Sequence, residues 1–191
     1  MLSLLIIKKE TMRITTENTI ALIIDLQEKL VPAMDGADFL LQQNEILIHG
    51  LQELEVPLLV SQQYTKGLGE TVPRIKSIVK DFSPIEKVEY SCYQVAEFVA
   101  KCNQLGAQNV IISGIESHVC VLLTAVDLKE AGFNPIVVLD AVSSRSMDNL
   151  DIATDRLRHE GIMVTSVESI LFELTSSAAN PHFKAISKLV K

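Results

Sequence analysis

The stretch Val110-Ile-Ile-Ser-Gly-Ile-Glu-Ser-His-Val-Cys120 begins with an apolar segment of strand length and leads into a longer one, 121–131, that stops at Gly132. This pattern predicts a buried strand, a turn and an apolar helix, with Cys120 in the turn. A thiol there faces the positive end of the helix dipole and a row of unpaired backbone N–H groups, a setting that lowers a cysteine pKa. We therefore predict that Cys120 is a nucleophile.

Short apolar segments alternate with helical patterns along the rest of the chain. The predicted strands are 20–24, 58–60, 85–88, 110–112, 136–139 and 162–165. Several are continuous apolar runs rather than alternating ones, which is typical of a parallel sheet covered on both faces. The sequence therefore predicts an α/β fold, a three-layer α/β/α sandwich with a six-stranded parallel sheet.

The chain of 191 residues suits one domain, and we predict a single domain over 1–191. Asn180-Pro181 predicts a last helix over 180–191, with Pro181 at its first helical position. Residues 1–11 are either an N-terminal extension or an interface strand, and the sequence leaves both open. The longest irregular stretch, 62–73, is expected to form a lid or a wall of the active site.

Composition narrows the class of protein. Hydrophobic residues make up 48% and charged residues 21%, and the net charge is −7. This acidic balance, without a stripe of Lys and Arg, argues against a nucleic-acid partner. The N-terminal apolar run is too short for a membrane span. Three cysteines without a CxxC pair fit a reducing compartment, so we expect a cytoplasmic protein with a small-molecule substrate.

Ligands of parallel α/β sheets bind beyond the carboxyl ends of the strands. At these ends the sequence places Asp25, the run Ser61-Gln62-Gln63-Tyr64, Lys87, Cys120 and Asp140. An acid (Asp25), a cation (Lys87) and a thiol (Cys120) at one edge support a mechanism of nucleophilic attack by sulfur. Asp25 accepts the thiol proton, the thiolate attacks a carbonyl carbon, and Asp25 returns the proton to the leaving group, while Lys87 balances the charge. Backbone N–H groups of the turn would hold the oxyanion.

The chain resembles the isochorismatase-like family of cysteine hydrolases, which includes nicotinamidases and N-carbamoylsarcosine amidohydrolases. The resemblance covers about 18–174 and rests on segments 21–27, 114–121 and 140–145 and on Lys87 after Pro84. It implies a Rossmann-like strand order, a homo-oligomer of two or more copies, and a catalytic triad of Asp25, Lys87 and Cys120. It also implies a cis peptide between Ile115 and Glu116, with an oxyanion hole from the N–H groups of Glu116 and Cys120.

The segment after the second strand departs from the nicotinamidases, which bind a metal there through an Asp and histidines. Residues 62–69 contain no histidine, so we expect no metal and no other cofactor. Segment 63–71 instead resembles the isochorismatase-domain-containing subgroup, whose substrates are poorly defined. True isochorismatases cleave a vinyl ether without needing a thiol, so Cys120 points away from them. The resulting prediction is a metal-independent cysteine hydrolase that cleaves a C–N, amide-like bond through a thioester.

Other residues near the predicted site have more than one interpretation. Gln27, Tyr64 and His118 are candidate substrate-binding residues, although the ring of His118 can also point away from the site. Arg145 either binds a substrate anion or braces its loop, and bracing is favoured. Cys92 either lines the pocket or packs in the core, and packing is favoured. Two alternative functions stay open: a non-catalytic binding or scaffold protein that retains the fold, and a thiol redox sensor that uses Cys120.

Overall fold

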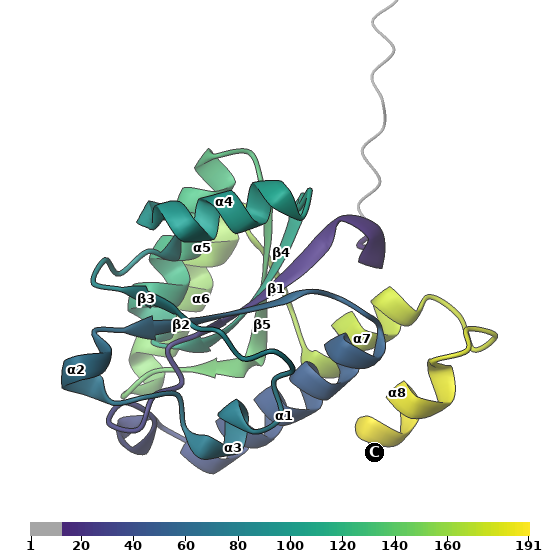
Figure 1. Cartoon of the computed structure of the whole chain (residues 1–191), viewed down its shortest axis with the longest axis horizontal. Coiled ribbons are helices and arrows are strands. Elements are labelled where there is room, and N and C mark those ends of the chain that lie inside the picture. The colour runs from purple at the N-terminus through teal and green to yellow at the C-terminus, as the bar shows by residue number, and fades with distance from the viewer. Residues whose placement is uncertain (1–12) are drawn as a thin grey trace, which may run out of the picture.

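The computed structural model describes residues 13–191. Its strands and helices form three layers, a central sheet with helices on each face (Figure 1). The strands are β1 (Thr19–Ile24), β2 (Leu58–Gln63), β3 (Ile85–Lys87), β4 (Asn109–Ile115), β5 (Asn134–Ser143) and β6 (Met163–Thr165). They form one sheet in the order β3-β2-β1-β4-β5-β6, and every neighbouring pair is parallel. The predicted six-stranded parallel sheet and its Rossmann-like order are confirmed.

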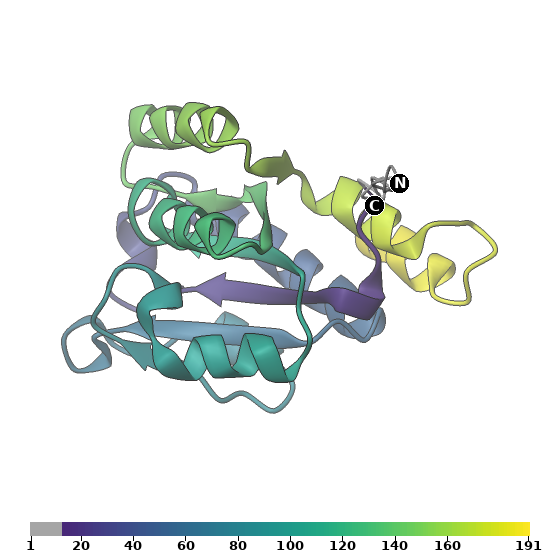
Figure 2. The ribbon, with the colours of Figure 1, turned by 90° about the horizontal axis from the view of Figure 1, so that it is seen from above.

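Helices cover both faces of this sheet. The α-helices are α1 (Ala37–Glu53), α2 (Thr65–Leu68), α3 (Pro73–Lys76), α4 (Ala96–Gln104), α5 (Leu122–Glu130), α6 (Met147–His159), α7 (Val167–Thr175) and α8 (Phe183–Leu189). Three short 3₁₀ turns, η1 (Thr16–Asn18), η2 (Val31–Ala33) and η3 (Cys92–Gln94), and one π-helical turn, η4 (Ser117–Val121), complete the described elements. Helices α4, α5 and α6 lie on one side, and α1, α7 and α8 on the other (Figures 1 and 2).

Strand β1 shows why both layers are needed. All six of its residues are buried. Ile20, Leu22 and Ile24 pack into the core beneath α4 and α5, whereas Ala21 and Ile23 belong to the cores on the α1 side. Because successive side chains of a strand point to opposite faces, a fully apolar strand requires cover on both. The continuous apolar runs of the sequence are explained by this packing.

Several boundaries differ from the prediction. Helix α8 begins at Phe183 rather than Pro181, because Pro181 and His182 lie in a turn closed by the Phe183 N–H donating to the Asn180 carbonyl. Helix α7 was not predicted, and the stretch 62–73 contains the end of β2 and helix α2. The two interpretations of residues 1–11 lie outside the described residues. Within 13–191, no helix has the length and apolar character needed to cross a membrane.

Candidate active site

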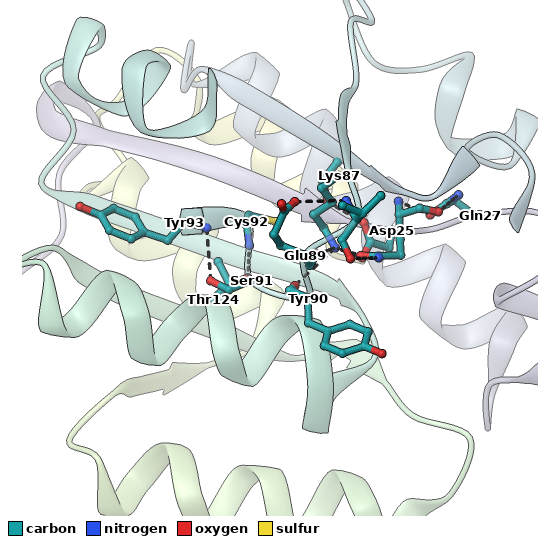
Figure 3. Close-up of polar contacts among 12 residues, drawn as sticks. Asp25, Gln27, Lys87, Glu89, Tyr90, Ser91, Cys92, Tyr93 and Thr124 are labelled. Atoms are coloured by element: carbon teal, nitrogen blue, oxygen red, sulfur yellow. Dashed lines mark hydrogen bonds and ion pairs between the residues drawn. The ribbon is translucent and has the colours of Figure 1, made fainter. Parts of the chain in front are cut away.

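Three chain segments meet at the carboxyl edge of the sheet. Asp25 directly follows β1, Lys87 is the last residue of β3, and Cys120 lies in η4 after β4. Strand β2 lies between β1 and β3, so the long side chain of Lys87 reaches past it to Asp25 (Figure 3). Asp25 has a positive φ of 51°, a left-handed conformation that Asp tolerates better than most residues.

Asp25 and Lys87 form a fully buried ion pair. Lys87 Nζ lies 2.7 Å from Asp25 Oδ2, and the two side chains are 1% and 0% exposed. The hydroxyl of Ser61 donates to the other oxygen, Oδ1, at 2.7 Å. A buried charge pair is tolerated only where further hydrogen bonds satisfy the remaining groups, and both carboxylate oxygens here have a partner. The carboxylate is thereby held in one orientation.

The ammonium of Lys87 has partners on several sides. Besides Asp25 it donates to Gln63 Oε1 at 2.5 Å and to the carbonyls of Glu89 at 3.3 Å and Tyr90 at 3.4 Å. Burial by itself lowers the pKa of Lys87, but the negative charge of Asp25, followed by Cys92 and Cys120, raises it overall. Lys87 therefore stays a cation at neutral pH.

Cys120 lies within the electrostatic reach of this pair, and its pKa differs from the sequence expectation. Its burial, with 7% exposed, raises the pKa of the thiol to about 12. The charge of Asp25 and a hydrogen bond with it raise the pKa further, whereas the charge of Lys87 lowers it. The expectation of a lowered pKa is therefore wrong: desolvation outweighs the helix N-terminus, and the thiol is protonated at rest.

The turn that carries Cys120 is tightly built. The peptide bond between Ile115 and Glu116 is cis, at the position that the resemblance implies. The N–H groups of Val119 and Val121 both donate to the carbonyl of Glu116, at 3.1 and 3.2 Å. Gly114 just before it has φ of +107°, and a Cβ there would lie 2.0 Å from the Ile24 carbonyl oxygen. This close approach brings the end of β4 against the end of β1, next to Asp25.

The loop after β5 braces the turn that carries Cys120. Glu116 Oε2 accepts hydrogen bonds from Arg145 N at 3.1 Å and Arg145 Nε at 3.0 Å. His118 Nδ1 lies 2.9 Å from Ser144 Oγ, so the His118 ring contacts this loop. The bracing interpretation of Arg145 fits these contacts. The contact with Ser144 accounts for the position of the His118 ring, so no catalytic role is needed to explain it.

The other two candidate binding residues lie on the neighbouring loop. Gln27 is fully buried, and its amide is bonded to backbone: Nε2 donates to the carbonyls of Gln63 and Gly69, and Oε1 accepts from the Gln63 N–H. These bonds fasten the loop that contains α2. Tyr64 is 51% exposed, and its N–H donates to the Lys87 carbonyl at 2.8 Å. Substrate binding by either residue stays a prediction.

The structure gives partners to residues to which the sequence analysis assigned no catalytic role. Ser61 and Gln63 on β2 bond directly to Asp25 and Lys87. Cys92 is buried beside the pair, its N–H donates to Thr124 Oγ1, and burial raises the pKa of its thiol to about 11 (Figure 3). Two sequence signals point to Ser61 and Gln63: their place at the carboxyl end of the second strand, and the alternation of side chains, which puts both on one face of that strand.

Asp140 does not join this site. Strand β5 continues to Ser143, beyond its expected end, and the Asp140 carboxylate accepts a hydrogen bond from the Val167 N–H at the start of α7. Burial raises the pKa of Asp140. In residues 13–191, no group of three or more His, Cys, Asp or Glu side chains is placed to hold a metal ion. The expectation of a metal-independent reaction stays a prediction.

Comparison with known proteins identifies the class of this fold and site. Residues 19–169 match the model of the isochorismatase domain. The chain therefore belongs to the isochorismatase family, whose relatives include hydrolases. Its similarity extends to isochorismatase domain-containing protein 2 of Danio rerio, with 33% identity over 178 residues that cover 93% of this chain and 89% of the relative. This similarity assigns the chain to the isochorismatase domain-containing subgroup.

Solved structures support the same assignment. The MAR1 ribonuclease from Caenorhabditis elegans is 36% identical, with a TM-score of 0.87, and covers 93% of this chain and 92% of its own. The YcaC gene product of Escherichia coli, described as an octameric hydrolase of unknown specificity, is 22% identical with a TM-score of 0.88, over 95% of this chain and 90% of its own. The second likeness shows the shared fold.

Proposed function

We propose that this protein is a metal-independent cysteine hydrolase that cleaves a C–N, amide-like bond of a small molecule. Asp25 is the general base and acid, Lys87 the charge-balancing cation, and Cys120 the nucleophile. The observation that carries the proposal is the fully buried ion pair of Asp25 and Lys87 beside a buried thiol. A buried charge pair beside a nucleophile costs stability in most settings, and its use in proton transfer gives it a function.

The raised pKa of Cys120 determines how the first step proceeds. Because the thiol is protonated at rest, its proton must leave as the sulfur attacks. Asp25 takes that proton, the sulfur bonds to the carbonyl carbon, and the carbonyl π electrons move to oxygen. The N–H groups of Glu116 and Cys120 are the proposed donors to this oxyanion. Counted together with the oxyanion, Asp25, Lys87 and Cys120 keep zero net charge through this step, which suits a buried site.

The second half of the reaction reverses the roles. The oxyanion collapses, the C–N bond breaks, and Asp25 gives its proton to the departing amine, which leaves a thioester on Cys120. Water then attacks the thioester and gives a proton to Asp25. The collapse of this second intermediate releases the carboxylic acid, and the proton on Asp25 returns to the Cys120 sulfur.

Hydrolysis of RNA is the second candidate, because the C. elegans relative carries the name of a ribonuclease. The net charge of −7 weighs against it, since RNA binding depends on neutralising phosphates. The cleavage of a phosphodiester also gives no role to a thiol protonated at rest. We therefore rank amide hydrolysis first and include RNA among the substrates to be tested.

The test is a screen of small amides, esters and single-stranded RNA with the wild-type protein and a Cys120→Ala variant. We expect hydrolysis of at least one amide, a drop of at least about 10³-fold in Cys120→Ala, and a thioester adduct on the Cys120 peptide by mass spectrometry. Full turnover by Cys120→Ala, or cleavage of RNA alone, would contradict the proposal. Reversible oxidation of Cys120 without any hydrolysis would favour the redox sensor, and tight binding of a partner protein without hydrolysis would favour the scaffold.

We also propose that the protein acts in the cytoplasm as a homo-oligomer. Large apolar side chains are exposed on the described surface, among them Val88 at 67% and Ile152 at 65%. A second copy would cover such groups, and the E. coli relative is described as octameric. Light scattering is expected to give a multiple of the 21.1 kDa chain mass. A monomer at micromolar concentration would refute the oligomer.

A further inference from the structure

Within residues 13–191, Gln63 is the one neutral side chain that bonds to the Lys87 ammonium. Its Oε1 accepts from Lys87 Nζ at 2.5 Å, a shorter contact than the 2.7 Å of the ion pair itself. The remaining partners of Nζ, the carbonyls of Glu89 and Tyr90, are at 3.3 and 3.4 Å. Among the described side chains, Gln63 and Asp25 therefore hold this ammonium from two sides.

Every polar atom of Gln63, in its side chain and its backbone, makes a hydrogen bond. Its Nε2 donates to the Val88 carbonyl at 2.8 Å, which orients the amide so that Oε1 faces Lys87. Its backbone N–H and carbonyl are both bonded to the buried amide of Gln27, and it pairs in register with Lys87 across β2 and β3. The amide can therefore orient the ammonium without moving to follow it.

The neutrality of Gln63 matters for the proton transfer. Asp25, Lys87 and Cys120 carry zero net charge both before and after the thiol proton moves to Asp25. A carboxylate at position 63 would make the set negative and would oppose the formation of a thiolate. An apolar side chain would remove the negative end of the amide dipole and leave the local potential more positive.

We propose that Gln63 is a positioning residue, which holds the Lys87 ammonium against Asp25 and, by being uncharged, keeps the nucleophile able to lose its proton. This role rests on the proposed function, because it acts through Lys87 on Cys120. The titratable groups that face Lys87 are Asp25 from β1, Cys92 from η3 and Cys120 from η4. Glu89 lies two residues after Lys87 in the chain, and its carboxylate accepts a hydrogen bond from the Val88 N–H.

The experiment measures the rate at which iodoacetamide alkylates Cys120, by peptide mapping, between pH 6 and 10, so that no substrate is needed. The variants are Gln63→Glu, which adds a charge, and Gln63→Met, which keeps the length without a polar atom. Gln42→Glu, at an exposed position of α1, is the control for an added charge elsewhere. Circular dichroism confirms that each variant is folded, and Gln63→Met serves if Gln63→Glu does not fold.

The two variants are expected to move the alkylation profile in opposite directions. Gln63→Glu should lower the rate at pH 8 about tenfold, equal to one unit of Cys120 pKa. Gln63→Met should raise it about threefold, and Gln42→Glu should leave it within about twofold of the wild type. Equal rates in all proteins, or shifts of the same sign in both Gln63 variants, would overturn the positioning role. Hydrolysis is tested separately by Cys120→Ala. The positioning role of Gln63 can therefore fail while the proposed function holds, and the proposed function can fail while the alkylation rates still shift as expected.

Discussion

At the scale of single residues, the site depends on how two opposite charges are kept out of water. Asp25 and Lys87 are each satisfied by a partner and by additional hydrogen bonds, from Ser61 to Asp25 and from Lys87 to Gln63. Removing one partner of such a pair leaves an uncompensated charge in the interior, which costs far more than the net contribution of the pair. The stability of the fold and the chemistry of the site are therefore coupled through Lys87.

A Lys87→Met variant tests this coupling. We expect it to lower the free energy of unfolding by roughly 3–5 kcal/mol, because the Asp25 carboxyl group is left buried without its partner. The measurement is a urea titration at pH 7 followed by circular dichroism. The double variant Lys87→Met with Asp25→Asn, which removes both charges, should be more stable than Lys87→Met alone. A Lys87→Met protein within about 1 kcal/mol of the wild type would refute the coupling.

At the scale of elements, the turn from β4 into α5 sets where Cys120 lies. Gly114 allows β4 to approach the end of β1, and the Glu116 carbonyl gathers two N–H groups of η4. The loop after β5 then binds the same turn through Arg145 and Ser144. Three consecutive strands of the sheet thus fix one short segment of chain.

Gly114→Ala is the sharpest test of the close approach. A Cβ at this position would lie 2.0 Å from a backbone oxygen of β1, which cannot move without distorting the sheet. Gly106→Ala is the matched control, because Gly106 also has a positive φ but nothing within 4 Å of the added Cβ. We expect Gly106→Ala to cost about 1 kcal/mol of unfolding free energy and Gly114→Ala at least about 2 kcal/mol more. Equal costs in urea titrations would contradict the role of Gly114.

Arg145→Ala tests the brace from the β5 loop. The Arg145 side chain is 64% exposed, and exposed ion pairs contribute little to global stability. We therefore expect a melting temperature within about 3 °C of the wild type, together with faster hydrogen–deuterium exchange of the amides in 116–121. Arg158→Ala removes the exposed pair with Asp155 and should not change exchange in that segment. Unchanged exchange in Arg145→Ala would show that the turn over 116–121 is kept in place without the contact to Arg145.

At the scale of the whole molecule, burial makes the folded chain retain protons at alkaline pH. The pKa of the Cys92 thiol is raised from 9.0 to about 11, and those of Cys102 and Cys120 to about 12, in each case first by burial. The pKa of Lys87 is also raised. A group whose pKa is raised on folding stabilises the fold fully below its unfolded pKa and loses that contribution as the pH rises through its folded pKa.

The free energy of unfolding should therefore be steady from pH 7 to about 9 and fall from there to pH 11. Urea titrations at each pH measure this dependence. A Cys102→Ala variant, which lacks one buried thiol away from the site, should show a shallower fall between pH 9 and 11. A wild-type stability that is constant to pH 11 would show that these thiols do not keep their protons on folding.

Much of the architecture follows from local patterns in the chain. The apolar runs predict the strands, and their continuity predicts a sheet covered on both faces, because a strand with two apolar faces must bury both. Asp25 directly follows one apolar run and Lys87 lies near the end of another predicted strand, which places both at one edge. Short elements were missed: α2 and α3 have four residues each, too few for a helical period to show.

The sequence by itself determined the six strands and the edge at which an acid, a cation and a thiol lie, since parallel strands all end on the same side of the sheet. Only the tertiary structure decided the pKa of Cys120 and the hydrogen bonds of Ser61 with Asp25 and of Gln63 with Lys87. It also decided that Asp140 bonds to the start of α7 instead of joining the site. The physical reason is that desolvation and hydrogen bonding depend on what distant segments pack around a group. A helix N-terminus is visible in the local sequence, whereas the burial that outweighs it is not.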